Sequence, residues 1–258
     1  MKEIGIQIFS LRDYIWDKSS FESTIKKLSE LGYKSIHTAG LPKDVTPKEY
    51  IDILKKNGMY VCGTHYSFDL MKNDIEGTMA HHRLWETTNI GIGGLDVPAR
   101  TDLSELKSFI KDFNKLAKIY GSEGFRLTYH NHGFEFLRID GTKTTMDILF
   151  EELDPVNTSF VLDTCWVAAG GGDVRHLIEK LAGRIDIIHL KDCYVSRVDE
   201  HWCAILDSTE VGNGTLWWDG IIDAARRAGV KHYVVEQDNS ADMMASVKQS
   251  ADYLKKYM

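Results

Sequence analysis

The sequence has little proline and cysteine and lacks a linker between domains. Four prolines and four cysteines occur among 258 residues, and no Pro-rich or Ser/Gly-rich stretch divides the chain. We therefore expect one domain over residues 1–258. The cysteines form no Cys-x-x-Cys pair, which disfavours a zinc knuckle or a disulfide scaffold and predicts reduced thiols. They are Cys62, Cys165, Cys193 and Cys203.

The chain has no excess of positive charge, with 31 Lys and Arg against 38 Asp and Glu, and long apolar runs are absent. The formal net charge is −7, which argues against a nucleic-acid partner because such proteins usually gather Lys and Arg on one face. No apolar run reaches the ~18 residues of a membrane-spanning helix. Residues 1–8 enter a strand-like pattern without the features of a signal peptide. We expect a cytoplasmic protein without a membrane partner; a leader already removed and a homo-oligomer both stay open.

A junction between a helical pattern and a strand-like run recurs along the chain. In each case a helical pattern ends in glycine, and an apolar, β-branched or aromatic run follows within a few residues. Glycine accepts the left-handed conformation that ends a helix, so each junction predicts a turn from helix to strand. The repetition indicates a βα unit. The four glycines are Gly32, Gly58, Gly121 and Gly229.

Counting the strand-like runs gives the number that closes a (β/α)8 barrel. Amphipathic patterns at 20–31, 104–120 and 241–256 predict helices around it, whereas 69–88 is the weakest helix prediction. An open doubly wound sheet is the competing architecture, but no Gly-rich phosphate loop follows the first strand. We predict a single (β/α)8 TIM barrel with strands at roughly 4–11, 35–39, 60–67, 89–97, 125–133, 159–165, 185–191 and 232–237.

Polar side chains end the last four of these runs. In a (β/α)8 barrel the C-terminal ends of the strands carry the active site. A lone acid there is often a helix N-cap, and a lone histidine is often a buried structural residue. Taken together, carboxylates and imidazoles on successive strands favour a site for Mn²⁺, Mg²⁺, Co²⁺ or Zn²⁺. The candidates are His130, His132 and Glu135 in the fifth run, then Asp163, His189 and Glu236.

These motifs resemble the xylose isomerase-like TIM-barrel superfamily of sugar and sugar-phosphate isomerases and epimerases. The resemblance covers essentially the whole chain. It implies one divalent metal ion held by late-strand acids and a histidine, which transfer here to Asp163, His189 and Glu236. The segments that carry it are 129–136 (YHNHGFEF), 162–166 (LDTCW), 189–192 (HLKD), 211–214 (VGNG) and 235–237 (VEQ).

The fifth strand departs from the family pattern. Epimerases of the family place a glutamate inside this strand, whereas here the first acid is Glu135. We predict Glu135 as the fourth ligand, with His130 as the alternative. His130 and His132 are two residues apart and so share one side of a strand. Facing the mouth, His132 would serve as a general base or acid. We expect Glu236 and either Glu135 or His132 to carry the protons, with His130 as a further catalytic candidate.

Four other residues are weaker candidates for contacts with a small sugar or polyol. His65 ends the third run, Lys191 follows His189 at a distance of two residues, and Gln237 follows Glu236. Trp166 would stack on the apolar face of a sugar, although large aromatics more often serve packing. Gln7 and Arg12 close the first run, where a surface or N-cap role is the prediction. His37 and His82 give no readable signal.

The resemblance and the residue types predict proton transfer beside a carbonyl. A metal ion that binds adjacent oxygens of a hydroxy-ketone stabilises the enediolate formed when the proton leaves, and return of the proton gives isomerisation or epimerisation. We expect such an isomerase or epimerase first. A dehydratase acting on keto-sugars or inososes, or a 3-keto-glycoside lyase, is the alternative. An apurinic endonuclease is disfavoured by the charge, and a non-catalytic sugar-binding barrel also stays open.

Overall fold

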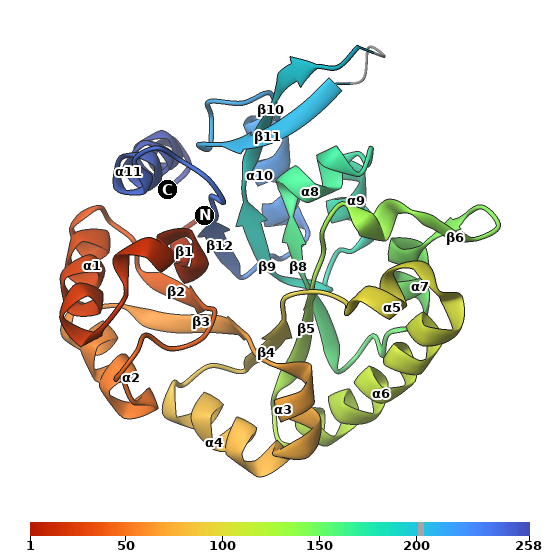
Figure 1. Cartoon of the computed structure of the whole chain (residues 1–258), viewed down its shortest axis with the longest axis horizontal. Coiled ribbons are helices and arrows are strands. Elements are labelled where there is room, and N and C mark those ends of the chain that lie inside the picture. Colours follow the sequence, from red (N-terminus) through yellow and green to blue (C-terminus); the bar gives the residue numbers. More distant parts are fainter. Residues whose placement is uncertain (201–203) are drawn as a thin grey trace.

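A closed barrel of eight parallel strands forms the centre of the molecule, with helices around it (Figure 1). The computed structural model describes residues 1–200 and 204–258. The strands lie in the order β1, β12, β9, β8, β5, β4, β3, β2, and β2 pairs with β1 again. The predicted single (β/α)8 barrel is confirmed. Its strands are β1 (Gly5–Gln7), β2 (Ser35–Thr38), β3 (Tyr60–His65), β4 (Asn89–Ile92), β5 (Arg126–His130), β8 (Thr158–Asp163), β9 (Ile185–Leu190) and β12 (His232–Val235).

Helices connect successive strands and cover the outside of the barrel. The uncertain segment 69–88 contains two short helices, because Asp74 ends the first and caps the second. The helices are α1 (Lys18–Glu30), α2 (Pro47–Lys56), α3 (Phe68–Asn73), α4 (Ile75–Leu84), α5 (Val97–Thr101), α6 (Leu103–Ser122), α7 (Thr145–Glu152), α8 (Thr164–Ala169), α9 (Val174–Lys180), α10 (Trp218–Arg227) and α11 (Met243–Leu254), with 3₁₀ turns η1 (Ile8–Tyr14), η2 (Phe134–Phe136) and η3 (Lys255–Tyr257).

Three of the four predicted glycine turns have the left-handed backbone that such turns need. Gly32, Gly58 and Gly229 have φ values of 99°, 67° and 78°. The prediction for Gly121 is wrong, because this residue lies inside α6 and the positive φ of 84° belongs to Gly124. A Cβ on Gly121 would lie 2.1 Å from Oδ1 of Asn157, so this glycine permits a close approach rather than a turn.

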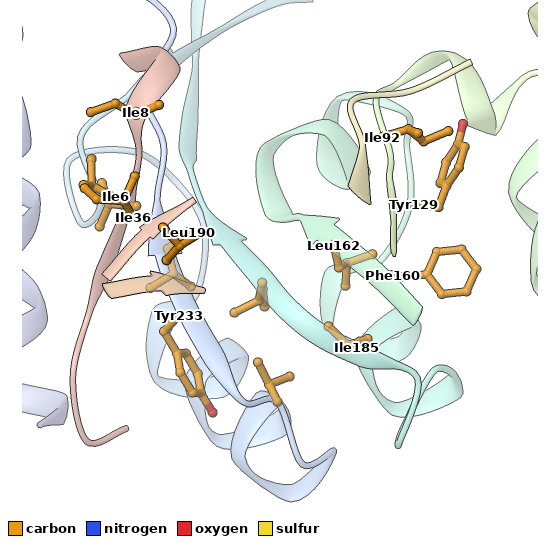
Figure 2. Packing of buried hydrophobic residues seen from close by; sticks show 14 of the residues in the cluster. Ile6, Ile8, Ile36, Ile92, Tyr129, Phe160, Leu162, Ile185, Leu190 and Tyr233 are labelled. Atoms are coloured by element: carbon orange, nitrogen blue, oxygen red, sulfur yellow. The ribbon is translucent and has the colours of Figure 1, made fainter. Parts of the chain in front are cut away.

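Side chains alternate between the two faces of each strand, so residues two apart both point into the barrel interior. This places a polar layer at the C-terminal mouth and an apolar layer next to it, deeper in the barrel. Val161, Ile187 and Val234 form a buried apolar cluster with Cys62. Each of the three valine or isoleucine residues lies two positions before Asp163, His189 or Glu236, which therefore face the same interior one layer higher. The neighbouring residues point outward into the core under the helices; Figure 2 shows part of this core, including Ile6, Phe160 and Leu190.

Two antiparallel hairpins add to the barrel, and neither was predicted. One pairs β6 (Arg138–Asp140) with β7 (Lys143–Thr144), and the other pairs β10 (Asp192–Val198) with β11 (Ala204–Thr209). The second projects from the barrel in Figure 1. The buried carboxylate of Asp192 fixes its base, since it accepts hydrogen bonds from the backbone of Gly212 and Gly214 and from Nε1 of Trp218.

Two general expectations about the chain also meet the structure. Within residues 1–200 and 204–258, no helix combines the length and apolarity that crossing a membrane requires. Cys62, Cys165 and Cys193 are buried free thiols, whereas Cys203 lies outside the described residues.

Candidate metal and catalytic centre

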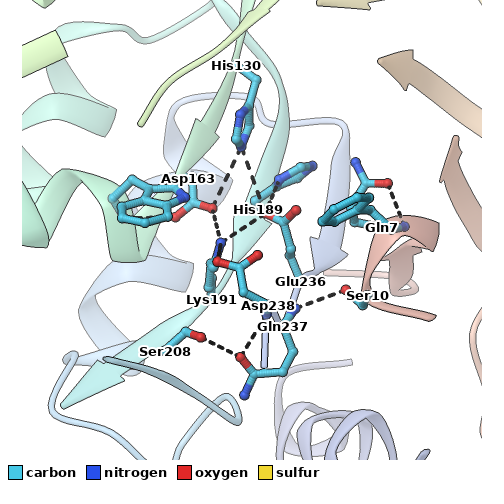
Figure 3. A network of polar contacts seen from close by, with 12 residues as sticks. Gln7, Ser10, His130, Asp163, His189, Lys191, Ser208, Glu236, Gln237 and Asp238 are labelled. Carbon is cyan, nitrogen blue, oxygen red and sulfur yellow. Dashed lines mark hydrogen bonds and ion pairs between the residues drawn. The ribbon is translucent and has the colours of Figure 1, made fainter. Parts of the chain in front are cut away.

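Four buried side chains from successive barrel strands meet at the C-terminal mouth. They are His130 at the end of β5, Asp163 at the end of β8, His189 in β9 and Glu236 after β12. One ligand atom from each lies within 4.8 Å of the others. Figure 3 shows them converging from different strands. Nδ1 of His189 lies 2.9 Å from Oε2 of Glu236, and Nε2 of His130 lies 3.7 Å from Oδ2 of Asp163.

The two oxygens of Asp163 have different environments. Oδ1 accepts a hydrogen bond from the backbone N–H of Trp166 and so caps α8. Oδ2 is buried, faces the cluster and has no hydrogen-bond partner, as is also true of Nε2 of His130. The N-cap role and a ligand role are therefore compatible in one residue. Two unpartnered, electron-rich atoms beside a second imidazole and carboxylate fit the donor set of a divalent cation.

A buried ammonium group lies against the same carboxylates. Nζ of Lys191 is 3.5 Å from Asp163, 3.5 Å from Glu236 and 2.6 Å from Asp238, and Lys191 is only 1% exposed. Burial lowers the pKa of this lysine, but the three carboxylates outweigh burial and raise the pKa above its ordinary value. Lys191 therefore supplies a permanent positive charge that partly balances the acids.

The charges around Glu236 keep its carboxyl group ionised. Burial raises the pKa of Glu236, but the charge of Lys191 holds that pKa well below its usual range. Burial opposes protonation of His130, yet the Asp163 and Glu236 carboxylates raise the pKa of this imidazole. The carboxylates thus attract positive charge strongly, which is what a cation site requires.

Glu135 does not join this cluster, contrary to the sequence-based expectation. The strand β5 ends at His130, and η2 turns Glu135 back toward the barrel wall. Its carboxylate accepts hydrogen bonds from the hydroxyl of Tyr129 at 2.6 Å and from the backbone N–H of His132 at 2.8 Å. Burial raises the pKa of Glu135 to about 7. The alternative candidate, His130, is the residue that lies in the cluster with Asp163, His189 and Glu236.

A cavity of about 200 Å³ opens directly onto the cluster. His132, predicted as a proton carrier, lies on its wall, and its Nδ1 has no hydrogen-bond partner. Burial lowers the pKa of His132 to about 3, so the imidazole is neutral at neutral pH. The lining residues are Phe9, Ala39, His65, Gly93, His130, His132, Trp166, Lys191, Glu236 and Asp238.

Three of the four predicted substrate contacts line this cavity, and one does not. His65, Trp166 and Lys191 are in the wall, and Nζ of Lys191 lies 4.8 Å from the ring centre of Trp166. Gln237 instead points to the base of the β10–β11 hairpin, where its Oε1 accepts a hydrogen bond from Ser208 (Figure 3). The position after Glu236 faces the other side of the chain, so Gln237 connects the hairpin to the barrel.

Two residues beneath the site were missed by the sequence analysis. Gln7 was expected at the surface or as a cap, and His37 gave no signal, yet both are 0% exposed. Gln7 does cap η1 through Phe9, and Nε2 of its amide lies 3.2 Å from Nδ1 of His37. The same His37 atom lies 2.7 Å from Nε2 of His189. The period of two could have placed Gln7 inside the barrel, because it alternates with Ile6.

A second cavity, of about 300 Å³, adjoins the first at Gly93. Its wall includes Tyr66, Phe68, Asp96 and Arg100 from the loops after β3 and β4. None of the four cluster residues lines it, so it leaves room for a larger substrate but is not the centre of the chemistry.

Comparison with known proteins agrees with this architecture. A family model described as a xylose isomerase-like TIM barrel matches residues 25–257. An inosose dehydratase of Geobacillus thermodenitrificans is 32% identical over 119 residues, 44% of this chain and 38% of the relative. An inosose dehydratase of Mesomycoplasma hyopneumoniae is 27% identical over 200 residues, 70% of this chain and 65% of the relative. The chain thus aligns with less than two thirds of the length of either relative.

Among solved structures, a sugar phosphate isomerase/epimerase from Parabacteroides distasonis is similar to this chain with a TM-score of 0.79. The match covers 98% of this chain and 93% of that one at 20% sequence identity. At that identity the likeness concerns the fold alone.

Proposed function

The chain belongs to the xylose isomerase-like TIM-barrel family, and on that premise we propose that it is a divalent-metal-dependent lyase. The proposed reaction removes water, or another oxygen leaving group, from the carbon next but one to the carbonyl of a keto-polyol or keto-sugar. The observation that carries this choice is the imidazole of His130 as the fourth member of the buried cluster, since the resemblance to the family's epimerases predicts a carboxylate from this strand. The two relatives named inosose dehydratase support the same reaction class.

His130, Asp163, His189 and Glu236 would hold the metal ion. Two imidazoles and two carboxylates suit Mn²⁺, Co²⁺ or Zn²⁺ better than Mg²⁺, which prefers oxygen ligands alone. When bound, the ion would polarise the substrate carbonyl and stabilise negative charge on its oxygen. The unpartnered Nε2 of His130 and Oδ2 of Asp163 support this assignment.

His130 separates the lyase proposal from epimerisation. A glutamate that binds a metal through one oxygen can still carry a proton on the other, and two such acids on opposite faces allow inversion of a carbon centre. A neutral imidazole bound through Nε2 has no second lone pair, because its proton is on Nδ1, which faces the carbonyl of Gly93 at 3.4 Å as a hydrogen-bond donor. The site therefore lacks the second metal-binding carboxylate that inversion would use to carry a proton. A base for the reaction must come from a residue outside the metal ligands.

We assign His132 as that base. It lies in the cavity wall, is neutral, and is held by stacking on Phe134 with ring centres 5.3 Å apart. Its backbone N–H donates a hydrogen bond to Oε2 of Glu135, so Glu135 fixes the position of His132 rather than that of the metal. In the proposed step His132 accepts the proton beside the carbonyl.

The leaving oxygen needs a proton, for which Asp238 is the assigned donor. It lines the cavity, and burial raises its pKa above the ordinary value. Nζ of Lys191 lies 2.6 Å from its Oδ2 and orients the carboxyl group. One proton passes to His132, one passes from Asp238 to the departing oxygen, and the carbon–oxygen bond electrons leave with that oxygen, so a hydroxyl departs as water.

Isomerisation or epimerisation is the second candidate, because Asp238 gives the cavity another carboxyl group for proton exchange with a substrate. Incubation of metal-loaded protein with keto-polyols, inososes and ketoses in deuterated water separates the two reactions. The lyase proposal predicts an unsaturated product with loss of oxygen. Deuterium beside the carbonyl of a recovered ketose, without loss of oxygen, would contradict it and support the second candidate.

A further inference from the structure

A chain of hydrogen bonds beneath the cluster connects the start of η1 to the metal-ligand candidate His189. It runs from the backbone N–H of Phe9 to the Gln7 amide, then to His37, then to His189. Gln7, His37 and His189 are each 0% exposed. Polar groups buried to that degree have one another as partners, so each donor and acceptor must match its neighbour.

The direction of the chain follows from its first link. Phe9 N–H donates to Oε1 of Gln7 at 3.3 Å, so the other end of the amide is the N–H donor. That nitrogen lies 3.2 Å from Nδ1 of His37 and 3.4 Å from Nδ1 of His65. Both Nδ1 atoms must therefore accept, which places the proton of each neutral imidazole on Nε2.

His189 takes its tautomer from His37. The single lone pair on Nδ1 of His37 also faces Nε2 of His189 at 2.7 Å, so the proposed arrangement has Nε2 of His189 protonated and sharing that lone pair with the Gln7 amide. The lone pair of neutral His189 is then on Nδ1, 2.9 Å from Oε2 of Glu236. A lone pair and a carboxylate oxygen repel at that distance unless a cation lies between them.

We propose that Gln7 is a positioning residue that sets the tautomers of His37 and His65 and, through His37, makes Nδ1 of His189 a metal ligand. A reversed Gln7 amide would present its oxygen to His37 and protonate Nδ1 of that ring. His189 would then accept through Nε2 and carry its proton on Nδ1, where it would block the ligand position. The Phe9 N–H opposes that reversal.

The same hydrogen bonds argue against a second metal site at three neighbouring histidines. His37, His65 and His189 also bring ring nitrogens within 4.8 Å of one another. In the proposed tautomers Nδ1 of His37 and of His65 already accept N–H bonds from Gln7, so this trio forms a hydrogen-bonded support rather than a second ion site. Nε2 of His65 is then an N–H without a protein partner, on a residue that lines the cavity, and it can donate to a substrate oxygen.

The test is the tautomer of each histidine in the full-length, metal-free chain, read from long-range ¹H–¹⁵N correlation spectra. The proposal requires His37 and His65 protonated on Nε2 only, and His189 protonated on Nε2. Gln7→Glu offers only acceptors to both rings and should move the proton of His37 to Nδ1. A wild-type His37 protonated on Nδ1 would overturn the proposal, whether or not the variant folds.

A second readout is the affinity of the chain for Zn²⁺, measured by calorimetry. Gln7→Met removes the donors without adding charge and should weaken binding about 10-fold, as loss of the groups that orient a ligand does. Gln249→Met, on the exposed face of α11, should leave the affinity unchanged. Equal affinities of Gln7→Met and wild type would refute the positioning role. Only this affinity measurement depends on the proposed metal site. If the tautomers are as predicted but the protein does not bind Zn²⁺, the metal site is rejected and the role of Gln7 in the hydrogen-bond network is retained.

Discussion

Nζ of Lys191 lies 3.5 Å from Oδ2 of Asp163, the same buried oxygen that is offered to a metal ion. The ammonium group therefore balances part of the negative charge of the cluster when no ion is bound, and in the proposed metal site it would compete with an ion that enters. Removing one partner of a buried ion pair lowers the stability of the fold, because the remaining charge stays buried without a counter-charge.

Lys191→Met should lower the free energy of unfolding of the metal-free chain by about 3 kcal/mol. Saturating metal should recover more stability in this variant than in wild type, because the new cation replaces the lost charge. Urea denaturation with a chelator and with added Mn²⁺ measures both effects. Lys248→Met, which removes an exposed pair with Asp252, should change stability by less than about 1 kcal/mol. Equal stability of Lys191→Met and wild type without metal would contradict the role of Lys191.

Glu135→Gln and His130→Gln separate the two candidates for the fourth ligand. His130→Gln should weaken Co²⁺ binding by about 100-fold or more, because a ligand is lost. Glu135→Gln should leave the affinity nearly unchanged but lower stability by about 1–3 kcal/mol, since an amide cannot accept both from Tyr129 and from His132 as the carboxylate does. Calorimetric titration and urea denaturation give the two values. The opposite order of affinities would restore Glu135 as a ligand.

His132→Gln should lower kcat by about 10²- to 10⁴-fold, the usual effect of losing a general base. Exchange of the proton beside the substrate carbonyl with deuterated water should slow by a similar factor. Metal affinity should stay close to that of wild type, because His132 is outside the four-residue cluster. An exchange rate unaffected by the substitution would remove His132 from the mechanism and direct attention to Asp238.

His82 should make the fold sensitive to acid. Its ring is buried between the Thr64 hydroxyl and the Thr78 carbonyl, and burial lowers its pKa to about 4. The unfolded chain takes up this proton near pH ~6.5, so the stability due to the depressed pKa is present above that pH and is lost as pH falls toward about 4.

The loss from this one histidine amounts to about 2–3 kcal/mol between pH ~7 and ~4.5. Urea denaturation of His82→Gln should show a decrease on acidification that is smaller by this amount. His176→Gln, at an exposed position of α9, is the matched control and should follow wild type. Identical pH profiles for His82→Gln and wild type would contradict this account of His82.

The barrel and three members of the cluster were predictable because they depend on local pattern. Apolar runs ending in Asp163, His189 and Glu236 identify the strand ends, and parallel strands bring those ends to one mouth. The errors arise where a tertiary contact decides. Glu135 turns away because the chain leaves the strand after His130 and the Tyr129 hydroxyl and His132 N–H are there to receive the carboxylate.

Gln7, His37 and the β10–β11 hairpin show what a single sequence hides. Gln7 and His37 occur in strands of only three and four residues, all of them buried, so the period of two that places Gln7 inside the barrel extends over very few positions. The hairpin depends on the buried Asp192, whose partners lie 20 to 26 residues further along the chain. Contacts between residues so far apart in the sequence produce no local sequence pattern from which the hairpin could be predicted.

The central claim is that His130, Asp163, His189 and Glu236 together hold one divalent cation. Calorimetric titration of the chelator-treated chain with Co²⁺ tests it most directly, with Asp163→Ala beside Asp173→Ala. Both aspartates cap a helix, α8 and α9 respectively, so the pair separates loss of a cap from loss of a ligand. The account predicts one ion per chain for wild type and Asp173→Ala and none for Asp163→Ala. Wild type that binds no ion, or Asp163→Ala that binds as tightly as wild type, would contradict it.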